Sequence, residues 1–93
     1  MPKVVELSDD MDASGMARMK PLFEELALGA DDVTLDLTNV DFIDSSGVGG
    51  LVFLYKRLRL KGRQLRLRVP RGQPRQIIHH LRLTDLLDEG GDA

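Results

Sequence analysis

The sequence predicts an α/β fold, in which helices flank a mixed, mostly parallel β-sheet. Segments with apolar residues at every second position alternate along the chain with segments whose apolar residues recur every three or four positions. They follow each other in the order strand, helix, strand, helix, strand, helix, which is typical of helices packed on a parallel sheet. A chain of 93 residues has room for one domain, so residues 1–93 are predicted to form a single domain with 89–93 as a flexible tail.

The first segments are a short strand and an amphipathic helix. Residues 3–7, "KVVEL", are predicted to form a strand because most of them are apolar. A polar turn follows, and apolar residues at spacings of three and four then indicate a helix over 15–28. Ser14 is the expected N-cap and Gly29 the expected C-terminal cap. Pro21 lies inside the pattern, so either the helix begins near it or a kink is tolerated.

The remaining segments repeat this order. Residues 33–38 alternate between apolar and polar side chains, which predicts a strand with one buried face. Helical spacing over 48–58 indicates a second helix, on which Phe53 and Leu54 are expected to be exposed and available to a partner. "QLRLRV" alternates again and predicts a third strand, and "RQIIHHLRL" indicates a short last helix.

Composition and charge exclude several classes of function. The chain has no cysteine, so disulfides, thiol catalysis and cysteine-ligated zinc are excluded. It has neither a signal-peptide pattern at its start nor an apolar run long enough to span a membrane, so we expect a cytoplasmic protein with no membrane insertion. Acidic residues dominate 1–44, whereas 45–84 hold ten basic residues and no acid. This division predicts either an acidic and a basic face or complementary charges that meet on folding.

The stretch "IDSSGVGG", residues 43–50, is the main candidate for a functional site. Its three glycines open the second helix, although a glycine inside a helix costs about 1 kcal/mol relative to alanine. Neither the dinucleotide pattern G-x-G-x-x-G nor a P-loop with its lysine is present, and no cofactor is expected. The esterase pattern G-x-S-x-G is absent too. Of the adjacent His79 and His80, at most one could face a site, and we expect one to be partly buried and one exposed.

Two charged clusters are weaker candidates. Asp9, Asp10 and Asp12 could suggest a magnesium site, but the remaining ligands of an octahedral site are not identifiable, so an acidic turn and no metal are expected. Basic residues of 56–63 surround the end of the second helix, where cations favour the helix dipole. Aromatic residues are scarce there and the overall pI is acidic, so no nucleic-acid binding is expected.

Ser45 suits the role of a modified residue. A hydroxyl between a strand end and a helix start, with glycines beside it, is open to a partner enzyme, and Gly47 and Gly49 are expected to keep that approach clear. Gly50 is expected to pack against the sheet. A phosphate on Ser45 would gain from the helix N-terminus but would add a charge of about −1.5 to −2 beside Asp44. This is the profile of a binding switch.

The segment "VDFIDSSGVGGLVFLYKRLRLKG" closely resembles the signature of STAS-domain proteins, the anti-sigma factor antagonists of bacteria. "LSDDMDAS" resembles the first loop of that family and "VTLDLTNV" its central strand. The resemblance extends from Val4 to Leu87 and is strongest over 33–62. It implies a non-enzymatic protein that binds an anti-sigma factor with serine kinase activity. Phosphorylation of Ser45 by that partner would weaken binding, and a separate serine phosphatase would restore it.

The same resemblance implies which residues contact the partner. They are Asp12 from the first loop and the run Asp44, Ser45, Ser46, Gly47, Val48 and Gly49. The chain departs from the family pattern at Asp9 and Asp10, where Gly and Glu are usual, and a last helix found in many relatives is short or missing. Some STAS proteins instead are constitutively bound subunits of a lipid-transporting ABC system or parts of stress-signalling assemblies. A scaffold of this kind is the alternative function.

Overall fold

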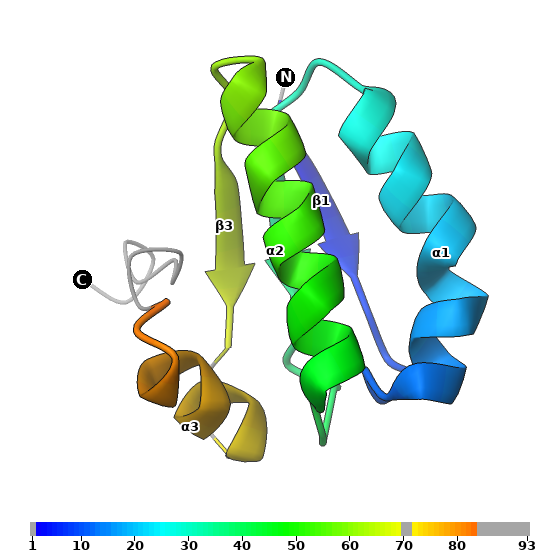
Figure 1. The fold of residues 1–93 in the computed structure, drawn as a ribbon, viewed down its shortest axis with the longest axis vertical. Coiled ribbons are helices and arrows are strands. Elements are labelled where there is room, and N and C mark those ends of the chain that lie inside the picture. Colours follow the sequence, from blue (N-terminus) through cyan, green and yellow to red (C-terminus); the bar gives the residue numbers. More distant parts are fainter. Residues whose placement is uncertain (1, 70–71, 84–93) are drawn as a thin grey trace.

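The computed structural model describes residues 2–69 and 72–83 and contains the predicted alternation of strands and helices. The elements, coloured along the chain in Figure 1, are β1 (Lys3–Glu6), α1 (Ala13–Leu28), β2 (Val33–Asp36), α2 (Ser45–Leu60), β3 (Leu65–Arg68) and α3 (Gln73–His80). Their order confirms the predicted α/β class. The flexible tail expected at 89–93 lies outside the described residues.

The described strands form one sheet in the order β1-β2-β3, and both pairs are parallel. Val5 is paired with Leu35, and Leu35 with Leu67, so these side chains lie on the same face. The expected mixed sheet is therefore a purely parallel one among the described residues. The reason is that each strand is followed by a helix that brings the chain back to the edge where the previous strand began.

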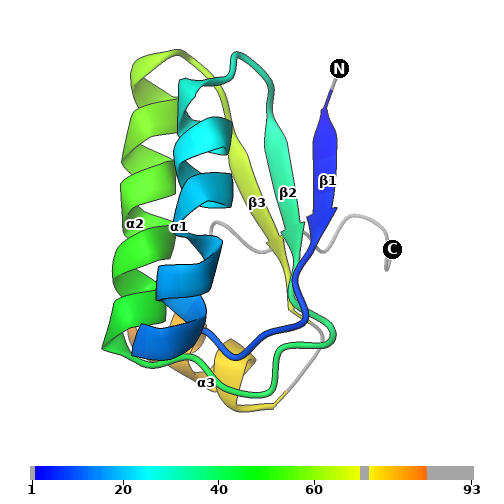
Figure 2. The ribbon, with the colours of Figure 1, turned by 90° about the vertical axis from the view of Figure 1, so that its right-hand side faces the viewer.

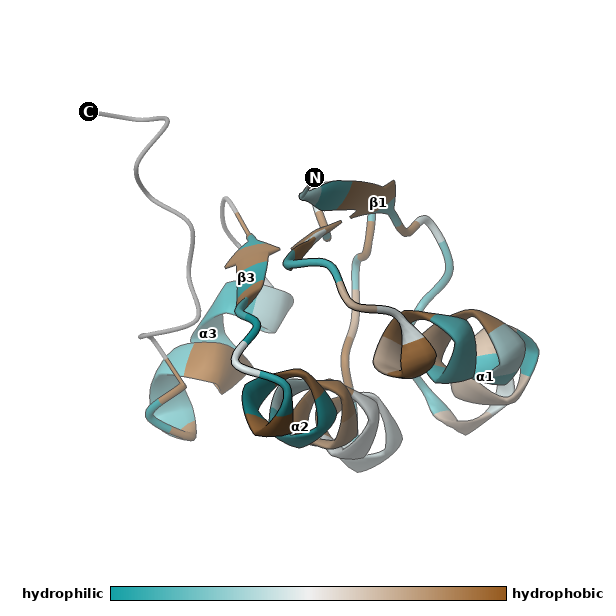
Figure 3. Cartoon of the chain, turned by 90° about the horizontal axis from the view of Figure 1, so that it is seen from above, coloured by the Kyte–Doolittle hydropathy of each residue, from teal (hydrophilic) through white to brown (hydrophobic). Residues whose placement is uncertain are grey.

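α1 and α2 cover one face of this sheet, and α3 packs at its carboxyl end (Figures 2 and 3). Leu35 and Leu67 point from the strands into the core, and α2 faces them with Leu51, Leu54 and Leu58; all five are fully buried. The expectation that Leu54 is exposed is therefore wrong. Leu54 shares a face with Leu51 and Leu58 because these residues are three and four positions apart. Phe53, the other residue of the expected pair, keeps 37% of its surface exposed.

The ends of α1 follow from its capping residues. Asp12, rather than the expected Ser14, is the N-cap, since its Oδ1 accepts a hydrogen bond of 2.7 Å from the N–H of Gly15. Gly29 ends the helix as expected, and its N–H donates to the carbonyls of Glu25 and Leu26. The helix continues through Pro21. No helix among the described residues is both long and apolar enough to cross a membrane.

Candidate functional site

The predicted site lies beyond the carboxyl ends of β1 and β2, where two loops are joined. The main-chain N–H of Met11 donates to the carbonyl of Phe42 at 2.9 Å, and the N–H of Asp44 donates to the carbonyl of Met11 at 3.2 Å. This pairing is an isolated parallel bridge between Met11 and Ile43, outside the strands of the sheet. It places the first turns of α1 and α2 side by side. Asp12, the N-cap of α1, is thereby brought next to Asp44, the N-cap of α2.

A glutamine from α3 holds the other side of the same loop. The N–H of Ile43 donates to Oε1 of Gln73 at 2.9 Å, and Nε2 of Gln73 donates to the carbonyl of Ile43 at 2.8 Å. The side-chain amide therefore takes the place that a third strand would have beside Ile43. The residue before Asp44 is fixed from both sides, by Met11 and by Gln73. Sequence reasoning missed Gln73, because a glutamine in a turn before a proline gives no signal that its amide pairs with a segment 30 residues away.

Asp44 starts α2 and leaves the two serines at the surface. Its Oδ1 accepts hydrogen bonds from the N–H of Ser46 at 2.7 Å and from that of Gly47 at 3.3 Å. An aspartate at the N-cap satisfies amides that have no partner within the helix and interacts favourably with the helix dipole. Ser45 and Ser46 are both exposed. Within the described part of the chain, the Ser45 hydroxyl makes no hydrogen bond, so it is accessible to a partner.

The three glycines of the stretch differ in what surrounds them. Gly47 is buried, and a Cβ atom there would overlap the Met11 carbonyl oxygen and lie 2.8 Å from Cγ2 of Ile43. The expectation that Gly47 keeps the approach to Ser45 clear is therefore wrong, since this glycine allows the two loops to join. Gly49 is exposed with no atom within 4 Å of an added Cβ, as expected for an open approach. Gly50 packs against Met16 of α1 rather than against the sheet.

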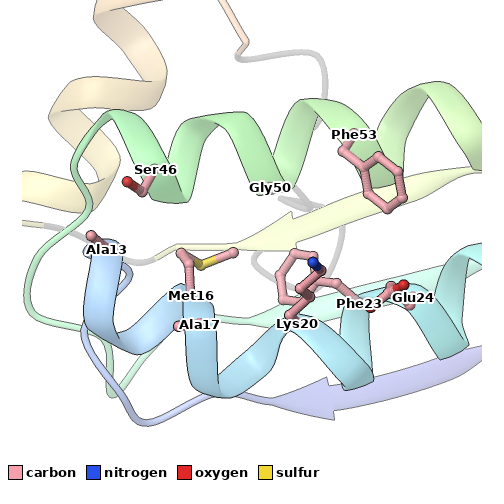
Figure 4. Close-up of a pocket in the computed structure, with 9 residues that line it drawn as sticks. All are labelled: Ala13, Met16, Ala17, Lys20, Phe23, Glu24, Ser46, Gly50 and Phe53. Carbon is pink, nitrogen blue, oxygen red and sulfur yellow. The ribbon is translucent and has the colours of Figure 1, made fainter.

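A shallow apolar groove runs along the seam between α1 and α2, beginning at Ser46 (Figure 4). Its volume is about 470 Å³, and its walls include Met16, Ala17 and Phe23 from α1 and Ser46, Gly50 and Phe53 from α2. Small residues on both helices leave the seam open, and the side chain of Met16 reaches across it towards Gly50. The groove adds apolar surface next to the exposed serines.

The structure thus divides the predicted contact residues into two groups. Ser45, Ser46 and Gly49 are exposed and lie on one end of α2. Gly47 is buried, and Val48 is half-buried and packs against the core, so neither contributes the open surface that was expected of it. Asp12 and Asp44 are half-buried and use their carboxylates as helix caps.

The aspartates and histidines that the sequence offered as other candidates do not form a site. Asp9 is exposed and pairs with Arg18, with Nε of the arginine 3.4 Å from Oδ2 of the aspartate. Among the described residues, no group of three or more histidines and carboxylates is placed to hold a metal ion. His79 and His80 are both exposed, so the expectation that one of them is partly buried is wrong. They lie at the end of α3, which packs on the domain mainly through Pro74 and Ile78.

Asp36, at the end of β2, has a pKa below its ordinary value of 3.8. The first cause is the Thr38 hydroxyl, which donates to Oδ1 of Asp36 at 2.5 Å. The N–H of Thr38 and the charge of Arg68, at 3.7 Å from Oδ2, act in the same direction, and partial burial opposes them. The ionised carboxylate fixes the turn with which the chain leaves β2 towards Asp44.

Comparison with known protein families identifies the domain. The family described as "Mlab, STAS domain" matches residues 2–88, which is nearly the whole chain. The chain therefore belongs to the STAS-domain family, as the resemblance of its central segment predicted. The match is to the MlaB type of STAS domain and does not single out the anti-sigma factor antagonists. A comparison with curated protein sequences gave no match.

Proposed function

From this family membership, we propose that the protein acts by binding rather than by catalysis. Its partner is the ATPase of a lipid-transporting ABC system, to which it binds constitutively as a scaffold subunit. The observation that carries the proposal is the exposed end of α2, where Ser45, Ser46 and Gly49 form an open surface on a rigidly held helix start. The MlaB-type family match favours this partner over an anti-sigma factor.

The rigidity of this surface supports a binding function. Ile43 is held by Met11 and by Gln73, and Asp44 fixes the first turn of α2, so the surface needs little ordering when a partner binds. Preorganised surfaces lose less conformational entropy on association than flexible ones do. The apolar groove beginning at Ser46 provides a place for an apolar side chain of the ATPase. No group of residues in the described site supplies a nucleophile with a base beside it.

A second candidate function rests on the accessibility of the Ser45 hydroxyl. In this alternative, the protein is an anti-sigma factor antagonist that binds a serine kinase, and Ser45 is the residue that the kinase phosphorylates. A serine phosphatase then restores binding. The retained serine after Asp44 is what favours this function, whereas a constitutive interface requires no particular chemistry at that hydroxyl.

Affinity purification from the source cells, followed by mass spectrometry, distinguishes the two functions. Recovery of an ABC ATPase supports the scaffold function, and recovery of a kinase of the anti-sigma type supports the antagonist function. Incubation of the recovered complex with ATP adds a second criterion. One phosphate on the wild-type protein, and none on Ser45→Ala, would establish Ser45 as a substrate and overturn the scaffold proposal.

The binding surface itself is tested with a matched pair of substitutions. Gly49→Arg places a long side chain on the proposed surface without a clash inside the domain. Ala30→Arg places the same side chain at an exposed position between α1 and β2. Gly49→Arg is expected to weaken binding to the purified ATPase at least tenfold, while Ala30→Arg leaves it unchanged. Equal affinities for the two variants would show that the partner binds elsewhere.

A further inference from the structure

The end of the molecule opposite Ser45 carries two leucines that the fold leaves uncovered. Leu28 ends α1 with 81% of its surface exposed, and Leu60 ends α2 with 84% exposed. Both helices run in the same direction, so their last residues lie at the same end of the domain (Figure 1). Lys61 joins these ends, since its Nζ donates to the carbonyls of Ala27 and Gly29. The two leucines therefore flank one small region.

Cations surround these leucines on the α2 side. We name the region the leucine–basic end, and its residues are Leu28, Leu60, Lys56, Arg57, Lys61 and Arg63. All of its members are exposed. Lys56 and Arg57 are four and three positions before Leu60, which places them on the same side of the helix. Hydrophobic and hydrophilic segments adjoin at the near ends of both helices in Figure 3.

Some of these cations have a structural role within the described part of the domain, but the two leucines have none. Arg57 lies over the ring of Phe53, with 5.1 Å between its Cζ and the ring centroid, and Lys61 bonds the end of α1. Cations near a helix C-terminus also interact favourably with its dipole. Two leucines more than four-fifths exposed, in contrast, contribute little to the core. Glu24 and Glu25 lie one turn before Leu28, and Asp31 and Asp32 follow it, so the positive charge comes from α2 and the residues directly after it.

We infer that the leucine–basic end binds the surface of an anionic lipid membrane. Basic side chains near such a surface are attracted to the headgroups, and exposed apolar side chains beside them enter the boundary between headgroups and acyl chains. Nucleic acid is a poorer match, because phosphates make no favourable contact with the two leucines. The rings of Phe53 and Tyr55 are each stacked against an arginine, Arg57 and Arg59, and are not free to stack on bases. This association is peripheral and needs no membrane-spanning segment.

Membrane binding at this end would orient the candidate site. α2 has 16 residues, with Ser45 first and Leu60 last. At 1.5 Å per residue, the fifteen steps of the helix separate Ser45 from Leu60 by roughly 22 Å. A domain held at the leucine–basic end would therefore present Ser45 and Gly49 away from the membrane, where a partner can reach them. This inference does not depend on which partner binds at Ser45.

Sedimentation of the purified protein with vesicles tests the inference. We expect the protein to bind vesicles in which about one lipid in three is phosphatidylglycerol and to bind pure phosphatidylcholine vesicles only weakly. At high salt, binding to the anionic vesicles should fall to the level seen with phosphatidylcholine. The double variant Lys56→Gln with Arg57→Gln should bind more than tenfold more weakly, since each cation removed costs about fivefold. Leu28→Ser with Leu60→Ser should cost at least tenfold.

Matched controls keep the result specific. Leu81→Ser removes a leucine with 42% of its surface exposed at the end of α3, and Arg66→Gln removes an exposed cation from β3. Both controls should bind vesicles like the wild type, and circular dichroism should show all variants folded. Absence of binding to anionic vesicles at low salt would overturn the inference. So would salt-dependent binding to a DNA duplex that persists when both leucines of the leucine–basic end are replaced.

Discussion

Substitution of Gly47 by alanine tests whether this glycine has a packing role. The added methyl group would overlap the Met11 carbonyl oxygen and lie 2.7 Å from Cβ of Met11 and 2.8 Å from Cγ2 of Ile43. The Met11 carbonyl belongs to paired main chain, and the two side-chain atoms belong to the same paired residues, so these neighbours have little freedom to move. Forcing an extra carbon into such a site costs about 1–3 kcal/mol, and the higher helix propensity of alanine offsets up to about 1 kcal/mol of it. We expect Gly47→Ala to lower the free energy of unfolding by about 1 kcal/mol.

Gly49→Ala is the matched control within the same helix. Nothing lies within 4 Å of an added Cβ there, so only the gain in helix propensity remains. This variant should be more stable than the wild type by about 0.5–1 kcal/mol. The two alanine variants should therefore differ by roughly 2 kcal/mol, or about 10 °C in Tm for a domain of this size. Urea unfolding followed by circular dichroism measures the difference, and equal stability of the two variants would refute the packing argument.

Three further substitutions test the local interactions that hold the site. Asp44→Ala should cost about 1 kcal/mol through the lost N-cap, while Asp44→Asn retains most of the stability; equal urea midpoints for the two would contradict the capping role. Because the pKa of Asp36 is lowered, its contribution to stability is present above pH 3.8 and is lost as the pH falls below that value. Thr38→Val should therefore lower the urea midpoint at pH 7 and have a smaller effect at pH 3, and an effect that is independent of pH would argue against this linkage. Gln73→Ala should cost about 1–3 kcal/mol and speed hydrogen exchange at the Ile43 amide, whereas unchanged exchange would exclude the proposed pairing.

The sequence predicted the order of the elements because periodicity is a local property. It could not predict which side of α2 faces the sheet. Val52 and Phe53 lie between Leu51 and Leu54 in the sequence and are apolar too, so several faces of the helix are apolar. The choice among them is made by the position of the sheet, which buries Leu51 and Leu54 and leaves Phe53 partly exposed. The expectation for Leu54 was wrong for this reason.

The predictions for the site residues were also limited by contacts with distant parts of the chain. The motif marked Ser45 and Gly49 correctly as surface residues, because a helix start after a strand is exposed at the sheet edge. The role of Gly47 depends on a carbonyl oxygen of Met11, and the position of Asp44 depends on Gln73, which holds the preceding residue. Both partners come from distant parts of the chain. Contacts of this kind leave no pattern near the motif, so they emerge only from the fold.

The arrangement at the start of α2 also bears on what a phosphate at Ser45 would do. A helix N-terminus normally attracts an anion because its amides are free. Here the carboxylate of Asp44 already accepts hydrogen bonds from the amides of Ser46 and Gly47. A phosphate on Ser45 would meet both occupied amides and the negative charge of Asp44, so it would be held outward rather than drawn against the helix. Its charge would then lie on the proposed binding surface, so modification of Ser45 would disrupt binding there while the fold of the domain is preserved.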